Sequence, residues 1–115
     1  MPKIAIASNS KGGLEDVVAS RFGRAPTFTI IELDDKGNII NVKVIENPGV
    51  NAPGGAGVKA VQALINEGVD IAVGPSFGPN AKAILDEMNI KAITIPAGTK
   101  ISEAIEYVKR EIGLA

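Results

Sequence analysis

The sequence has 115 residues, the length of one ordinary domain, and its formal net charge is −1. It contains neither cysteine nor histidine, which excludes disulfide frameworks, thiolate-held iron–sulfur clusters, Cys/His zinc sites and catalysis by either residue within one chain. The balanced charge argues against nucleic-acid binding, and no apolar run is long enough for a signal peptide or a membrane span. We therefore expect one cytoplasmic domain over residues 1–115 that binds neither nucleic acid nor membrane.

Three strands are predicted in the first half of the chain. Short apolar runs with β-branched residues indicate strands at Lys3–Ala7, Thr27–Leu33 and Ile39–Glu46. The connection from residue 8 to residue 26 is long and mostly irregular, and such loops in compact domains are often functional. The cluster Asp34–Asn38 is typical of a turn, which predicts that the second and third strands form an antiparallel hairpin.

The second half of the chain alternates helices and strands. Helices that connect short apolar strands imply parallel strands with right-handed crossovers, so we expect an α/β fold. Ser102 is expected to cap the last helix. The predicted strands are Asp70–Val73 and Lys91–Ile95, and the predicted helices begin near Val58, Pro79 and Ile101.

The loops with unusual composition are expected at one edge of the sheet. If the third, fourth and fifth strands are parallel, and the first is assumed to run with them, the loops that leave these strands lie at their carboxyl ends. Open α/β sheets bind ligands at this edge. Three of the loops also lead into helix starts, whose N–H groups lack partners within the helix and accept anions readily. The sequence therefore predicts a ligand-binding rim.

Two glycine-rich loops are candidates for ligand contact. Gly54–Gly57 precedes a helix and would let backbone amides approach a ligand, although it is also compatible with a flexible loop. It lacks the Gly-Lys-Ser/Thr of a Walker loop and the strand context of a dinucleotide fingerprint. In Gly74–Asn80, Ser76 and Phe77 either face a ligand or lie in a tight turn with Phe77 packed inward.

Arg21-Phe22-Gly23-Arg24 places two cations around one aromatic ring. Arginine suits bidentate recognition of carboxylate or phosphate, and the alternative is a solvated loop anchored by Phe22. The carboxylates show no spacing that acid–base catalysis would need. We therefore expect no catalytic residues and no enzymatic activity.

Four motifs in chain order carry a resemblance to a known family. The sequence resembles the dinitrogenase iron–molybdenum cofactor biosynthesis family, and its small stand-alone archaeal and bacterial members in particular. The resemblance covers nearly the whole chain and implies a three-layer α/β/α fold with a ribonuclease H-like motif. Its five-stranded mixed sheet would have strand order 3-2-1-4-5, with strand 2 antiparallel. The motifs are Arg21–Pro26, Glu46–Pro48, Gly55–Gly57 and Gly78–Ala81.

The resemblance also implies a function and a set of binding residues. The implied role is to bind or carry an iron–sulfur or iron–molybdenum cluster, or its precursor, together with metal-cluster assembly or acceptor proteins. Some relatives use a histidine before the Phe-Gly pair, or cysteines, but this chain has neither residue type. It would therefore have to hold a cluster through arginines, backbone amides, carboxylates or ligands shared with a partner. No metal ligand is assigned. The motifs and the rim together give these cofactor-binding candidates: Asn9, Arg21, Phe22, Gly23, Arg24, Asn47, Gly54, Gly55, Gly57, Ser76, Gly78 and Asn80.

Two other functions stay open. One is a regulatory protein–protein interaction module without a small-molecule ligand. The other is an enzyme that uses a rim residue such as Ser76, which the lack of a base beside it disfavours. The identity of the ligand and the oligomeric state are also open.

Overall fold

The structure is a computed structural model that describes residues 2–114. Its strands and helices alternate as expected in the second half of the chain, and three strands occupy the first half. The elements are β1 (Lys3–Ser8), β2 (Thr27–Leu33), β3 (Ile39–Glu46), α1 (Ala56–Asn66), β4 (Ile71–Gly74), α2 (Pro79–Glu87), β5 (Lys91–Thr94) and α3 (Ile101–Glu111).

The five strands form one mixed sheet with the order β3-β2-β1-β4-β5, which confirms the expected order. β2 is antiparallel to both β1 and β3, whereas β1 and β5 are parallel to β4. The assumed direction of the first strand is therefore correct. The β2–β3 turn forms because the Asp34 carboxylate accepts hydrogen bonds from the backbone N–H groups of Lys36 and Asn38.

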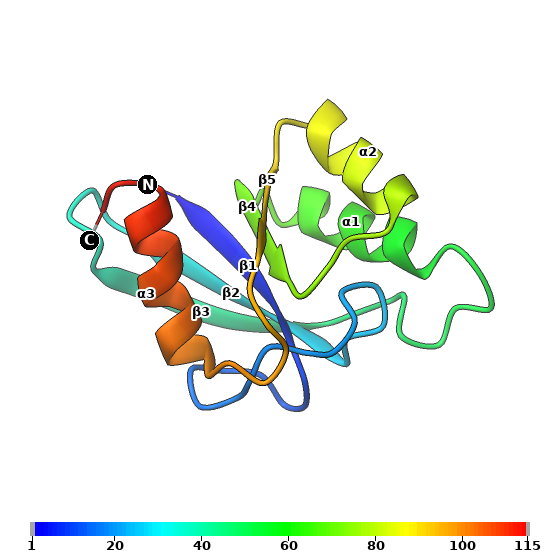
Figure 1. The fold of residues 1–115 in the computed structure, drawn as a ribbon, viewed down its shortest axis with the longest axis horizontal. Coiled ribbons are helices and arrows are strands. Elements are labelled where there is room, and N and C mark those ends of the chain that lie inside the picture. Colours follow the sequence, from blue (N-terminus) through cyan, green and yellow to red (C-terminus); the bar gives the residue numbers. More distant parts are fainter. Residues whose placement is uncertain (1, 115) are drawn as a thin grey trace.

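Helices cover both faces of the sheet and make three layers (Figure 1). α1 and α2 lie on one face and α3 on the other. The central strands are buried on both sides, so alternate residues feed different cores: Ala5 and Ala7 of β1 face α1 and α2, whereas Ile4 and Ile6 face α3. In the part of the chain that the structure describes, no helix is long and apolar enough to cross a membrane.

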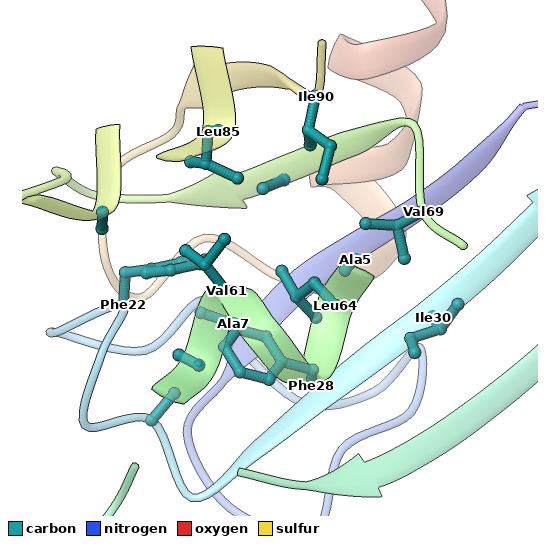
Figure 2. Packing of buried hydrophobic residues seen from close by; sticks show 14 of the residues in the cluster. Ala5, Ala7, Phe22, Phe28, Ile30, Val61, Leu64, Val69, Leu85 and Ile90 are labelled. Carbon is teal, nitrogen blue, oxygen red and sulfur yellow. The ribbon is translucent and has the colours of Figure 1, made fainter. Parts of the chain in front are cut away.

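The core between the sheet and α1 and α2 extends to the loop that precedes β2. Figure 2 shows Phe22 of this loop beside Val61, with Phe28 of β2 nearby. The ring centroid of Phe22 lies 5.2 Å from that of Phe28 and 4.8 Å from that of Phe77. These aromatic contacts attach the Arg21–Arg24 loop and the loop before α2 to the same core.

The start of α3 differs from the expectation. Its N-cap residue is Lys100, and no side chain caps the helix, so the prediction of Ser102 as the cap is wrong. The backbone N–H groups of Ile101 and Ser102 instead donate to the carbonyl oxygens of Asp16 and Leu14. The loop between β1 and β2 therefore satisfies the groups that a side-chain cap would otherwise satisfy.

Candidate functional site

A cavity of about 370 Å³ lies where the chain leaves the carboxyl edge of the sheet, on the side of α1 and α2. Three loops that are far apart in the sequence meet there: the Arg21–Arg24 segment, the start of α1 and the segment from residue 76 into α2. The lining residues are Arg21, Phe22, Gly23, Arg24, Gly55, Ala56, Gly57, Val58, Ser76, Gly78, Pro79, Asn80 and Ala81.

Two helices begin at this cavity without side-chain caps. Gly55 is the N-cap of α1 and has a φ of 67°, a left-handed conformation that glycine adopts without strain. Gly78 is the N-cap of α2, and Pro79 occupies the first turn, where its missing N–H is not needed. The first-turn N–H groups of both helices have no acceptor within their helix, so they are available to a ligand.

The wall between the Arg21–Arg24 segment and α1 requires a glycine at residue 23. A Cβ atom added there would lie 2.9 Å from the backbone nitrogen of Gly57 and 3.0 Å from its Cα atom. Both neighbours are backbone atoms, which cannot rotate away. Gly23 therefore permits the loop to lie directly against the first turn of α1.

The two arginines of the loop have different surroundings. The half-buried Arg24 donates from Nη1 to the carbonyl oxygen of Ala52, at 2.6 Å, and so ties its loop to the segment before α1. Arg21 is exposed at the cavity, and it takes part in none of the ion pairs found within residues 2–114. Arg21 is therefore the cation with a guanidinium free to contact a ligand.

The charges around the cavity favour an anion. Its lining contains two arginines but no aspartate, glutamate, histidine or cysteine. The two helix N-termini add partial positive charge. Across residues 2–114 no group of three or more histidine, cysteine, aspartate or glutamate side chains could hold a metal ion. The site thus offers hydrogen-bond donors and positive charge, without side chains that would ligate iron directly.

Asn47 has a structural position behind the cavity. Its side chain is 2% exposed, and its Nδ2 donates to the carbonyl oxygens of Gly23 and Ala25 at 3.0 and 2.9 Å. Its Oδ1 accepts a hydrogen bond from the backbone N–H of Gly49. These three bonds use the amide and join the two loops that form the wall of the cavity.

The other predicted residues divide into two groups. Nine of the twelve candidates line the cavity, whereas Asn9 and Gly54 join Asn47 outside it. Asn9 is exposed in the loop after β1, and its backbone N–H donates to Val17. Four lining residues were not among the candidates: Ala56, Val58, Pro79 and Ala81. The sequence placed Val58, Pro79 and Ala81 in the predicted helices.

The loop before α3 does not reach the cavity. Residues Val18, Gly98 and Thr99 join the loop after β1 to this segment through backbone hydrogen bonds. Because α3 covers the opposite face of the sheet, these contacts form on that side. The loops that were expected to form a single rim therefore form two groups, and only one of these groups surrounds the cavity.

Asp16 organises the second group of loops. Its Oδ2 accepts hydrogen bonds from the backbone N–H groups of Ser10 and Gly12, and its Oδ1 accepts one from Val17. Partial burial raises the pKa of Asp16, but the hydrogen bonds from Val17, Ser10 and Gly12 outweigh this effect and hold the pKa below its ordinary value of 3.8.

A second cavity, of about 320 Å³, lies between the end of β5 and α3. It contains none of the predicted binding residues. Arg110 lies 5.9 Å from the ring centroid of Tyr107 there, and a hydrogen bond to Glu111 raises the pKa of Tyr107. Both side chains are exposed.

The fold and the cavity together describe a small three-layer α/β domain with a cavity lined by two arginines at one edge of its sheet. Comparison with known proteins gives its family. The sequence profile of the dinitrogenase iron-molybdenum cofactor family matches residues 2–111, so the chain belongs to this family. This confirms the resemblance seen in the four motifs.

Three relatives illustrate the range of similarity. An uncharacterized protein of Methanocaldococcus jannaschii is 29% identical over 89 residues, which are 77% of this chain and 74% of that protein. The apo form of the orange protein from Desulfovibrio gigas superposes with a TM-score of 0.82 at 26% identity, over 99% of this chain and 90% of that one. A NifB-like protein from Thermotoga superposes with a TM-score of 0.75 at 32% identity, with the same coverages of 99% and 90%.

Proposed function

We propose that this protein binds an anionic cofactor, or its precursor, in the cavity and carries it between other proteins. The observation that carries the proposal is the convergence of two uncapped helix N-termini and Arg21 on a cavity without carboxylates. The family, whose name refers to the iron–molybdenum cofactor, supports it. So does the similarity to the orange protein, whose structure is of an apo form.

A metal–sulfur cluster or its precursor suits this cavity as cargo. The lining has no thiolate, imidazole or carboxylate, so it does not fit direct ligation of iron by side chains. Sulfur or oxygen atoms on the outside of an anionic cluster can instead accept hydrogen bonds from backbone N–H groups and from Arg21. Any bond to the metal itself would come from ligands that a partner supplies.

The same cavity supports a role without catalysis. Its one hydroxyl belongs to Ser76, and its lining contains no side chain that could act as a general base. As partners we propose proteins that assemble or accept the cofactor.

The strand order 3-2-1-4-5, with β2 antiparallel, supports our assignment of the fold as ribonuclease H-like.

Binding can be tested by thermal unfolding with two probes, molybdate and inorganic phosphate. A probe present at about 100 times its Kd is expected to stabilise the fold by about 2.7 kcal/mol. Arg21→Ala is expected to abolish most of this stabilisation and to leave the unfolding temperature without a probe unchanged, because Arg21 is exposed. Arg24→Ala is expected to lower that temperature, because it removes the bond to Ala52.

The matched control is Arg110→Ala, which removes an exposed arginine beside the other cavity. It is expected to retain the full response to the probes. The cargo is tested by measuring iron and molybdenum in protein purified anaerobically from cells that assemble such clusters. The proposal is wrong if neither probe stabilises the protein and neither metal copurifies, or if Arg110→Ala and Arg21→Ala reduce the response equally.

A further inference from the structure

The outer strand β3 has an apolar side that none of the helices within residues 2–114 covers, although Gly12 of the loop after β1 lies against Val44. Ile40, Val42 and Val44 are 50, 38 and 41% exposed. Val42 lies opposite Ile31 of β2 and Val44 opposite Thr29, so these side chains lie on the sheet face that α3 covers farther along. Figure 1 shows α3 on this face and β3 at the border of the sheet. Ile40 lies at the β-bulge where the β2–β3 register shifts, and it is the next residue but one before Val42 in β3. We call these three exposed apolar residues of the edge strand the β3 strip.

The backbone of β3 also has free hydrogen-bonding groups beside the strip. The N–H of Asn47 donates to the carbonyl of Pro26, which makes residues 26 and 47 a hydrogen-bonded pair. Hydrogen-bonded pairs alternate along an antiparallel ladder, so the N–H and C=O groups of Val42 and Val44 point away from β2. The bond from Leu33 to Pro2 on the other side of β2 gives the same alternation. Since β3 ends the sheet, these groups are free to pair with another strand.

The sequence of β3 is complementary to itself in one antiparallel register. A two-fold axis at Val42 places Val42 opposite its own copy and Val44 opposite Ile40 of that copy. The same register places Lys43 opposite Asn41. An axis at Lys43 would set two ammonium groups directly against each other, and an axis at Val44 would set Val42 against the carboxylate of Glu46. Of these three registers, charge and apolar matching favour the first.

We propose that two copies of this chain associate through β3, with the two-fold axis at Val42. The two β3 strands would pair antiparallel and join the two sheets into one continuous sheet. The second copy is the occupant that matches both the apolar side chains and the outward backbone groups. None of the residues that line the 370 Å³ cavity belongs to β3, so this inference does not rest on the proposed function.

Sedimentation over a range of concentrations tests the association. The average mass measured for the wild-type protein is expected to rise from 11.9 kDa towards twice that value as its concentration rises. Val42→Lys places like charges opposite each other at the axis and is expected to weaken association by at least about tenfold. Met88→Lys is the matched control, because Met88 is 49% exposed on the distant end of α2. It is expected to associate like the wild type.

Single-cysteine variants test the register, because the chain has no other cysteine. Opposed Cα atoms in a hydrogen-bonded antiparallel pair lie about 5.5 Å apart, within the range that a disulfide spans. Val42→Cys is therefore expected to form disulfide-linked dimers on mild oxidation. In the same register, the two copies of residue 44 are offset by roughly 13 Å along the strands, so Val44→Cys is expected to remain unlinked.

Several results would overturn the proposal. One is a wild-type protein that stays monomeric up to about 1 mM. A second is a dimer that Val42→Lys leaves intact. A third is efficient cross-linking of Val44→Cys without cross-linking of Val42→Cys, which would refute the axis at Val42.

Discussion

Asn47 and Arg24 are polar residues whose side chains donate hydrogen bonds to backbone carbonyls of neighbouring segments. Asn47 contacts Gly23 and Ala25, and Arg24 contacts Ala52. Their partners lie more than twenty residues away in the sequence. A motif can place such residues at the correct edge of the sheet, but it does not contain these partners. The difference between Arg21 and Arg24 therefore became visible only in the folded chain.

Asn47→Ala is expected to destabilise the protein by about 3 kcal/mol. The change leaves two carbonyl groups and one N–H group without their partners in a buried position, and each unpaired group costs about 1–3 kcal/mol before relaxation. Urea unfolding measures the loss. Asn51→Ala, at an exposed position in the same loop, is the control and is expected to change stability by less than about 0.5 kcal/mol. Equal losses in the two variants would contradict the structural role of Asn47.

Asp16 is expected to make stability depend on pH in the acid range. Its pKa in the folded protein lies below the ordinary value of 3.8, so the unfolded chain takes up the proton first as the pH falls. The stabilisation is complete above pH 3.8 and is lost as the pH falls through the lower pKa of the folded state. Asp16→Asn is expected to reduce the slope of stability against pH in this window, measured by urea unfolding at several pH values.

Asp34 provides the comparison for this measurement. The backbone N–H of Asn38, followed by its side chain, lowers the pKa of Asp34 in the β2–β3 turn. Asp34→Asn is expected to remove a separate part of the same slope, and the double variant should lose both parts because the two residues share no partner. An unchanged slope in Asp16→Asn would show that its hydrogen bonds do not persist in solution.

At the scale of elements, the contact between the Arg21–Arg24 loop and α1 depends on the absence of a side chain at residue 23. Gly23→Ala is expected to push the loop away from the first turn of α1, which lowers stability by about 1–3 kcal/mol and weakens anion binding. Gly54→Ala is the control, because no atom lies within 4 Å of its added Cβ. Thermal unfolding with and without molybdate measures both effects. Normal binding by Gly23→Ala would show that this contact does not shape the cavity.

The order and type of the elements were predictable, but the partners of the helix ends were not. Apolar spacing along α1, α2 and α3 and the β-branched runs predict the elements to within a few residues. The α3 start uses the carbonyl groups of Leu14 and Asp16, far away in the sequence, where local composition suggested a Ser102 cap. Because of this contact, the start of α3, which was one of the three helix starts predicted to bind an anion, is not part of the site.

At the scale of the molecule, the cavity and the β3 strip lie on different parts of the sheet. The cavity is formed by loops and by α1 and α2, whereas the strip belongs to the outer strand. We therefore expect the two to act independently. Val42→Lys should leave the response to molybdate unchanged, and Arg21→Ala should leave the association constant unchanged. A change of more than about tenfold in either cross-measurement, which corresponds to about 1.4 kcal/mol, would reveal coupling between them.

The contrast between the helix starts has a consequence for hydrogen exchange. The first-turn amides of α3 at Ile101 and Ser102 are bonded to carbonyl groups, so their protons should exchange slowly with solvent. The corresponding residues Ala56 and Gly57 of α1 line the cavity, and no backbone acceptor within residues 2–114 is found for their amides, which should exchange quickly in the free protein. An occupant that accepts their hydrogen bonds would slow them while leaving α3 unaffected. The protein thus contains both a reporter of occupancy and an internal reference, readable amide by amide without any label added to the chain.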